Sequence, residues 1–376
     1  MIYLDNAATT GRKPQQVINA VSTALSKYSA NPGRSGHALS ESAALLVYSA
    51  RERVADFFGA EPSEVVFTLN CTHALNMAIK GMVKKGDHVI ISSYEHNAVL
   101  RPVYKLAEDG VIELDIAKVI VGDNEATYRS FEHLIRSNTK LIICTHASNV
   151  TGEIMPIRAL CKLCREKGIT FIVDAAQTAG IIPIDMSDGI DYLCVAAHKG
   201  LYAPMGTGIL ICKKPLNDTI IEGGTGTFSN MLKQPKDMPE RLESGTLNVP
   251  GIAGIKAGID FLETQGLKKI HRHEISLLQT LYDGLYTMPG VRLYTARPTA
   301  DKYAPVLSFN VEGKNSMETA AHLSKNGIAV RAGLHCAVLA HKTLGTVDVG
   351  TVRVCPSVYN TKTDVLSLLK VIKTLK

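Results

Sequence analysis

Short apolar runs recur along the first two thirds of the chain, and stretches with helical spacing separate most of them. These runs lie at residues 65–68, 89–92, 141–144, 171–173 and 192–195. Nearly continuous apolar strands that alternate with helices indicate a parallel sheet covered on both faces. We therefore expect a three-layer α/β/α arrangement with a mostly parallel sheet in this part of the chain.

The pattern changes near residue 251. A long helical stretch runs through residue 285, and shorter strand-like runs follow at 306–311, 328–330 and 351–354. Apolar residues at helical spacing over 363–376 predict a final amphipathic helix. We therefore predict a large domain at residues 14–254 and a smaller α+β domain formed by residues 1–13 and 255–376.

Composition adds few constraints. The 376 residues are 45% hydrophobic and 20% charged, which is ordinary for a globular protein and argues against disorder, collagen or coiled coil. The net charge of +6 comes without a block of like charges, so a basic nucleic-acid-binding module is a weak alternative and no nucleic-acid partner is expected. No run of 18 apolar residues occurs, and the first residues lack the features of a signal peptide, so we expect a cytoplasmic protein without a membrane partner.

Polar clusters follow each of the five predicted strands. They are Asn70-Cys71-Thr72-His73, Glu95-His96-Asn97, His146-Ala147-Ser148-Asn149, Asp174-Ala175-Ala176-Gln177 and His198-Lys199. In an open parallel sheet, ligands bind outside the carboxyl ends of the strands. The five clusters are therefore predicted to converge on one crevice.

The first cluster precedes a helical run, so a phosphate could lie on Thr72 at the helix N-terminus, although plain helix capping explains the same residues. The chain has no Walker A sequence and no Gly-x-Gly-x-x-Gly fingerprint, which argues against an NTPase or a dinucleotide enzyme.

Asp174 ends an apolar strand, where a lone carboxylate is costly unless a positive group faces it. A protonated pyridine nitrogen would serve, and pyridoxal phosphate (PLP) also needs a lysine and an anion site. Lys199 ends the next strand-like run. Taken singly, Asp174 would be a helix cap and Lys199 a surface lysine, but their convergence with His96, Asn149 and Gln177 favours PLP.

Seven motifs in this order resemble those of the class V aminotransferase-fold PLP enzymes, and the cysteine desulfurases in particular. They span nearly the whole chain and comprise Tyr3 to Thr10, Glu95-His96, Ser148 to Gly152, Val173 to Gln177, His198-Lys199, Glu243 to Asn248 and Arg331 to Ala337. The resemblance implies the PLP-dependent transferase fold type I.

The resemblance also implies roles for the crevice. Lys199 would be the Schiff-base lysine, His96 would stack on the pyridine ring, and Asp174 would pair with the ring nitrogen. Asn149 and Gln177 would address the ring hydroxyl. The phosphate would be held by three further residues, Thr72, His198 and, from the partner subunit of a homodimer, Thr246. The sequence departs from the family at Ala196, where a serine usually supplies one more phosphate contact.

The small domain would bind the substrate carboxylate. The resemblance assigns this role to Arg353, whose guanidinium offers two parallel hydrogen bonds, with Arg331 assisting. Cys336 follows Gly333-Leu334-His335 in a predicted turn, with Arg331 and His335 near enough in sequence to favour a thiolate. The Arg-x-Gly-x-His-Cys motif matches the group II desulfurases and makes Cys336 the sulfur-accepting nucleophile.

The implied reaction converts L-cysteine to L-alanine. Lys199 removes the α-proton, Cys336 takes the sulfur as a persulfide, and a scaffold or acceptor protein collects it for iron–sulfur cluster assembly or another sulfur-transfer pathway. Selenocysteine lyase, cysteine sulfinate desulfinase and a class V aminotransferase remain alternatives that do not need Cys336. No metal site is expected, because Cys161-x-x-Cys164 has no second pair.

Overall fold

The computed structural model describes residues 1–33, 36–227 and 229–375. Its centre is a seven-stranded sheet with the strand order β2-β8-β7-β6-β5-β3-β4. Strand β8 runs antiparallel to both its neighbours, and the other neighbouring pairs are parallel. The strands are Val65–Thr68 (β2), Asp87–Ser92 (β3), Ile112–Ala117 (β4), Thr139–Thr145 (β5), Thr170–Asp174 (β6), Tyr192–Ala196 (β7) and Gly208–Cys212 (β8). The five predicted strands are confirmed, and β4 and β8 are additional.

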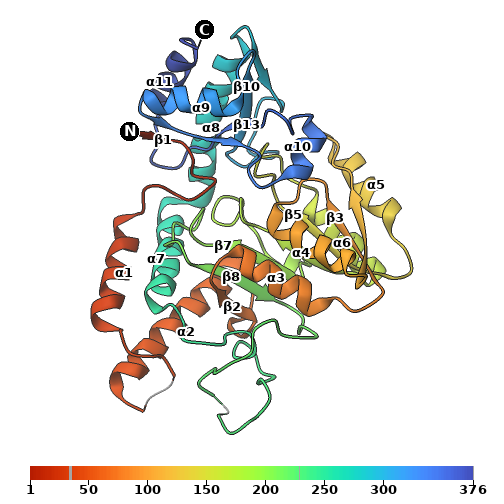
Figure 1. The fold of residues 1–376 in the computed structure, drawn as a ribbon. Coiled ribbons are helices and arrows are strands. Elements are labelled where there is room, and N and C mark those ends of the chain that lie inside the picture. Colours follow the sequence, from red (N-terminus) through yellow and green to blue (C-terminus); the bar gives the residue numbers. More distant parts are fainter. Residues whose placement is uncertain (34–35, 228, 376) are drawn as a thin grey trace.

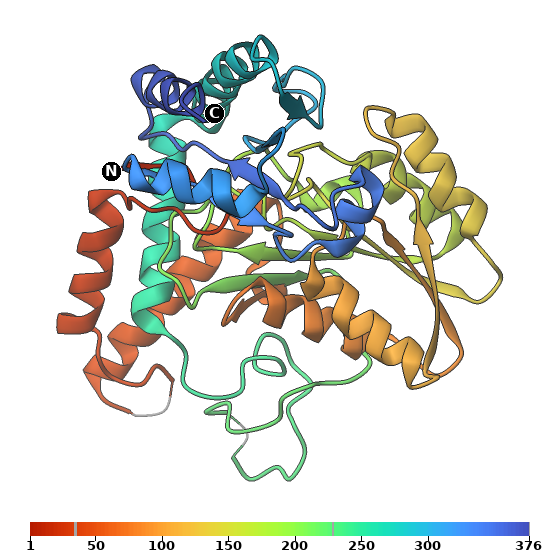
Figure 2. The same ribbon diagram turned by 45° about the horizontal axis from the view of Figure 1, so that its top comes forward.

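Alternating side chains place this sheet between two apolar layers. In β2, Val65 and Phe67 join one core cluster and Val66 joins the other, as the two-residue period of a strand requires. Helices α3 and α4 cover the face to which Val66 belongs, and α2, α5, α6 and α7 cover the opposite face. The predicted three-layer arrangement is thus confirmed, and Figure 2 shows the helices on both sides of the sheet.

The helices of this layer structure lie between and beside the strands of the large sheet. They are Gln15–Lys27 (α1), Ala38–Phe58 (α2), Cys71–Met82 (α3), Asn97–Glu108 (α4), Asn124–Leu134 (α5), Ile157–Lys167 (α6) and Val249–Gln265 (α7), with short 3₁₀ turns at Pro62–Glu64 and Met186–Asp188. The predicted long helix after residue 251 is two helices, because Gly266 at φ 84° ends α7 before Leu267–Tyr286 (α8) begins.

The chain beyond α8 forms a second, smaller sheet above the carboxyl ends of the large sheet's strands (Figure 1). Its order is β12-β13-β10-β9, all antiparallel, and β1 pairs with β11 beside it. The elements are Ile2–Tyr3 (β1), Val291–Leu293 (β9), Leu307–Val311 (β10), Ser316–Lys325 (α9), Ile328–Ala329 (β11), Arg331–Gly333 (β12), Val338–Leu344 (α10), Thr351–Val354 (β13) and Lys362–Ile372 (α11).

The small sheet has its own apolar core with α8 and α11, and Leu4 of the N-terminal segment is buried in it. The domain division at residues 13/14 and 254/255 stays a prediction. No helix in the described ranges has the length and apolar character needed to span a bilayer.

Candidate active site

The carboxyl ends of the central strands open into a pocket of about 220 Å³. The predicted convergence of the polar clusters is confirmed, and two arginines of the small sheet complete the wall. Its lining includes Thr72, His96, Asn149, Asp174, Gln177, His198, Lys199, Arg331 and Arg353. The pocket therefore lies between the two sheets, where residues far apart in sequence meet.

Lys199 lies in the turn that follows β7. The chain packs closely there, because a Cβ on Gly200 would collide with the carbonyl oxygen of Ala179. Burial lowers the pKa of Lys199, and the nearby carboxylate of Asp174 opposes that shift. A lysine held in this way has more of the neutral amine that a carbonyl condensation needs.

Asp174 ends β6 and is only 3% exposed. Its Oδ1 accepts a hydrogen bond from the backbone N–H of Ala176 at 2.9 Å and lies 3.5 Å from the Sγ of Cys71. Its carboxylate forms no ion pair within the part of the chain that the structure describes. A buried carboxylate beside a pocket is suited to a cationic ring nitrogen.

Two histidines of the pocket are neutral. His96 caps α4, where its Nδ1 accepts from the backbone N–H of Ala98 at 3.0 Å, and burial lowers its pKa to about 4. Burial also lowers the pKa of His198 to about 4, and its Nδ1 lies 3.1 Å from the hydroxyl of Thr9. An uncharged imidazole is free to stack on an aromatic ring or to donate one hydrogen bond.

The phosphate prediction falls at the start of α3. Asn70 caps that helix by accepting from the backbone N–H of His73 at 2.9 Å, and Thr72 lies in the first turn and lines the pocket. The two interpretations of this segment are therefore compatible. Asn70 caps the helix, and Thr72 is left to contact an anion in the pocket. Ala196 also lines the pocket and offers no hydroxyl there.

Arg353 lies on β13, is 1% exposed and points into the pocket. One Nη donates to Asp5 Oδ1 at 2.9 Å and the other to the carbonyl of Asn149 at 3.1 Å, while its Nε has no partner within the described chain. The Oδ1 of Asn149 likewise finds no partner among the residues that the structure describes. Unsatisfied buried polar atoms on a pocket wall are suited to a polar ligand.

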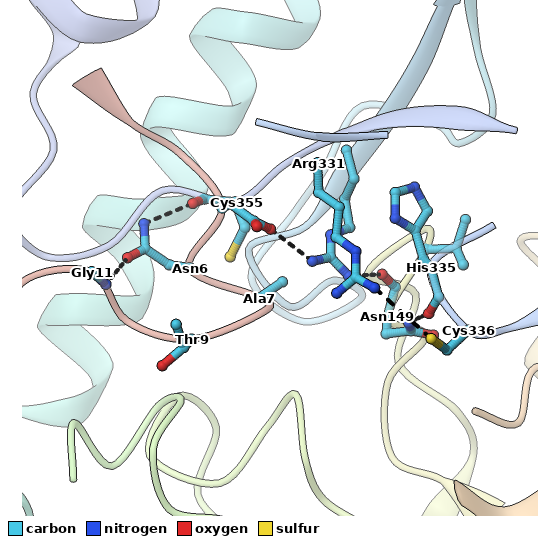
Figure 3. Close-up of polar contacts among 12 residues, drawn as sticks. Asn6, Ala7, Thr9, Gly11, Asn149, Arg331, His335, Cys336 and Cys355 are labelled. Carbon is cyan, nitrogen blue, oxygen red and sulfur yellow. Dashed lines mark hydrogen bonds and ion pairs between the residues drawn. The ribbon is translucent and has the colours of Figure 1, made fainter. Parts of the chain in front are cut away.

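Cys336 lies at the rim of the pocket rather than on its floor. It is exposed, and its Sγ is 3.8 Å from an Nη of Arg331 (Figure 3). It lines a groove of about 380 Å³ together with Thr72 and His96, both of which also line the pocket. The groove connects the thiol with the pocket through shared walls.

The backbone at the thiol is unusual, because His335 and Cys336 are both left-handed, with φ 49° and 56°. Three contacts hold it there. His335 Nε2 lies 3.1 Å from the carbonyl and the hydroxyl oxygen of Thr351, Asn149 Nδ2 donates to the His335 carbonyl at 2.8 Å, and the backbone N–H of Asn97 donates to the Cys336 carbonyl at 2.7 Å.

Thr246 does not lie in this pocket. It is exposed and, among the described residues, accepts a single long hydrogen bond of 3.4 Å from Asn31 Nδ2. The segment that carries it is anchored by a buried ion pair between Glu243 and Arg51, whose closest atoms are 2.8 Å apart. The predicted role of Thr246, which is to contact the phosphate bound in the other subunit of a homodimer, stays a prediction.

Sequence reasoning missed the contribution of the N-terminal segment. Asp5 pairs with Arg353, and the hydroxyls of Thr9 and Thr10 and the Nζ of Lys13 all donate to the carbonyl of His198, at 3.0 to 3.2 Å. The motif at Tyr3 to Thr10 indicated that this segment belongs to the site. Its contacts join residues more than 180 positions apart, so the spacing of residues along the chain could not predict them.

Known proteins with similar sequences and structures match this chain over nearly its full length. The family described as aminotransferase class-V matches residues 2–368. A probable cysteine desulfurase of Pyrococcus abyssi is 36% identical over 389 residues, covering 100% of this chain and 94% of the relative, and one of Methanothermobacter thermautotrophicus is 32% identical over 374 residues, covering 97% and 92%. The apo structure of a cysteine desulfurase from Thermococcus onnurineus superposes with a TM-score of 0.90 at 35% identity, covering 100% of this chain and 94% of the other.

Proposed function

The chain belongs to the class V aminotransferase family, and from this premise we propose that it is a PLP-dependent cysteine desulfurase. It converts L-cysteine to L-alanine and holds the sulfur as a persulfide on Cys336. The observation that carries the proposal is the juxtaposition of Lys199, Asp174 and the unpartnered Nε of Arg353 in one pocket, with an exposed thiol at its rim. The full-length relatives named as desulfurases support the same activity.

The pocket residues fit PLP. Asp174 supplies the anion for a pyridinium nitrogen, Asn149 Oδ1 and Gln177 supply polar groups for the ring hydroxyl, and Thr72 with His198 supplies donors for the phosphate. Lys199 is the amine to which the cofactor binds. When bound, PLP serves as an electron sink for the pair released from the substrate's α-carbon.

The remaining tasks fall to this chain's own side chains. Arg353 binds the substrate carboxylate through its inward-facing guanidinium, with Arg331 beside it. The Lys199 amine takes the α-proton, for which its lowered pKa suits it. Cys336 attacks the substrate sulfur as a thiolate, so that an S–S bond forms as the carbon–sulfur bond breaks.

An exposed persulfide needs a recipient. Because Cys336 lies at the surface, we propose that a scaffold or acceptor protein collects its sulfur for iron–sulfur cluster assembly or another sulfur-transfer pathway. We also propose a homodimer in which Thr246 of one subunit reaches the other's phosphate site, since Thr246 lies outside its own pocket. Seven buried free thiols support a reducing, cytoplasmic location.

The test uses the purified protein reconstituted with PLP. The protein is expected to be yellow and to form alanine and sulfide in equal amounts from L-cysteine and a thiol reductant. Cys336→Ala should keep the colour but lose persulfide and sulfide formation. Full desulfurase turnover by that variant would contradict the assignment and favour an activity, such as selenocysteine lyase or cysteine sulfinate desulfinase, that does not need the thiol.

A further inference from the structure

A carboxylic acid is buried behind the lysine. Glu274 on α8 is 1% exposed, accepts one hydrogen bond from the backbone of Val358, and leaves its Oε2 without a partner within the described chain. A buried carboxylate without a cation is costly, so the neutral acid is favoured, and burial raises the pKa of Glu274 to about 8. The reaction as described above makes no use of this group.

A cavity joins Glu274 to Lys199. It measures about 20 Å³, enough for a single water molecule, and lies between the N-terminal segment, α8 and the chain after β13. Polar side chains line it beside the two groups, including Gln177, Tyr202, Cys355 and Ser357. Lys199 lines both this cavity and the main pocket, so it separates Glu274 from the substrate side.

Uncharged side chains surround Glu274 most closely, and Lys199 is the ionisable amine of the same cavity. The hydroxyl of Tyr202 and the thiol of Cys355 face it, and burial raises the pKa of both. Cys355 lies next to Ala7 and Asn6 of the N-terminal segment (Figure 3). Tyr359 lies farther away. The ion pair of Asp5 and Arg353 lies on the other side of Cys355, and its two opposite charges offset each other. On α8 itself, His271 and His273 bond to the backbone carbonyls of Tyr303 and Asn360.

We propose that Glu274, through a water molecule held in this cavity, stores the proton that Lys199 exchanges in each turnover. The proposal deepens the proposed function and rests on it. When Lys199 needs a proton, the acid O–H bond breaks, the water passes a proton on, and an N–H bond forms on the amine. The reverse transfer restores the acid, and nothing is oxidised or reduced. Because Glu274 acts through Lys199, it is a positioning residue that does not touch the substrate.

The first test reads the protonation of Glu274 without the cofactor. Infrared spectra of the PLP-free protein should show the C=O stretch of protonated carboxylic acids at pH 7 that fades as the pH passes about 8, because burial raises the pKa of both Glu274 and Glu95 to about that value. Glu274→Gln should remove the part of this band that Glu274 contributes. Glu153→Gln, which changes another buried acid that lines neither cavity next to Lys199, should leave it in place. A spectrum at pH 7 that Glu274→Gln does not change would overturn the proposal.

The second test reads turnover. With PLP bound, Glu274→Gln should lower kcat for L-cysteine by at least about tenfold while leaving KM nearly unchanged, since Arg353 is untouched. The wild type should lose activity as the pH rises through about 8, because the stored proton is then lost, and the variant should lack this limb. Equal pH profiles and kcat values would overturn the proposal.

Glu274→Asp keeps an acid at the site and should recover part of the lost kcat together with the alkaline limb. It is the variant to compare if Glu274→Gln does not fold, and a wild-type profile with no limb near pH 8 would then overturn the proposal. If the protein makes no alanine from cysteine, the proposed function is wrong, and the infrared titration still shows whether Glu274 is protonated. If Glu274→Gln leaves the desulfurase activity unchanged, only the inference about Glu274 is wrong and the proposed function stands.

Discussion

The floor and the rim of the pocket are built in opposite ways. The inner residues of the pocket, its floor, are Asp174, Lys199 and Arg353. Asp174 and Arg353 are buried on strands and Lys199 is half-buried in the turn after β7, whereas Cys336 at the rim is exposed on a turn. The other seven cysteines are buried, as Asp174 and Arg353 are. The difference teaches that the fold shields the groups that handle protons and charge, and presents to solvent the one thiol that has to pass an atom to another molecule.

The two regions also differ in how they are held. Asp174 and Arg353 are fixed by neighbouring strands on both sides. Asp174, for example, is paired in register with Thr145 and Cys194. The rim has no such ladder, and its left-handed backbone depends on side chains such as His335 and Asn149. A change in one of these anchors is therefore expected to affect the rim while sparing the floor.

The sharpest test of the comparison is thiol labelling. Iodoacetamide at neutral pH should modify Cys336 at least about 1000-fold faster than the others, because burial raises their pKa, that of Cys161 for instance to about 12. Mass spectrometry of the folded protein measures the rates residue by residue. Cys336→Ser should abolish the fast phase and Cys355→Ser should preserve it. Fast labelling of Cys355 would break the distinction between floor and rim.

A second test exchanges the charged group of the floor. Arg353→Lys keeps the charge but loses the planar fork that reaches Asp5 and Asn149, so KM for L-cysteine should rise about 30-fold. Steady-state kinetics measure it. Arg331→Lys is the matched control, because Arg331 is only partly buried and should change KM by less than about tenfold. Equal effects would mean that the floor arginine has no special role.

The smallest effect concerns acid stability. Burial lowers the pKa of His146, which directly follows β5, to about 4, below the ordinary value of 6.5. The unfolded chain therefore binds a proton that the folded chain does not, so stability present above pH 6.5 is lost as the pH falls towards 4. Urea unfolding should show a loss of about 1 to 2 kcal/mol from this group between pH 7 and 4.5.

His146→Gln should reduce that slope, and His133→Gln, which changes an exposed histidine, should not. A variant at His146 with an unchanged pH dependence of stability would show that this position after β5 does not require a neutral side chain.

Local pattern was enough to place most of the floor. Asp174, Lys199 and the cluster at His96 follow predicted strands, and strand direction alone implies that they meet. The unequal exposure of the cysteines was also foreseeable, because Cys336 follows a glycine-containing turn while the others lie in apolar or helical runs. The roles of Arg353 and Thr246 needed the family resemblance, since an arginine at a strand end is ordinarily an ion-pair partner.

The sequence by itself determined the alternation of strands and helices, the edge at which polar residues collect and the identity of the exposed thiol. These follow from covalent geometry, which repeats every two residues in a strand and every 3.6 in a helix. Only the tertiary structure decided that Asp5 pairs with Arg353, that Thr351 supports His335 and that Glu274 lies behind Lys199. Those contacts depend on how the small sheet packs over the large one, and a buried polar group finds its partner wherever packing excludes water, at whatever distance along the chain.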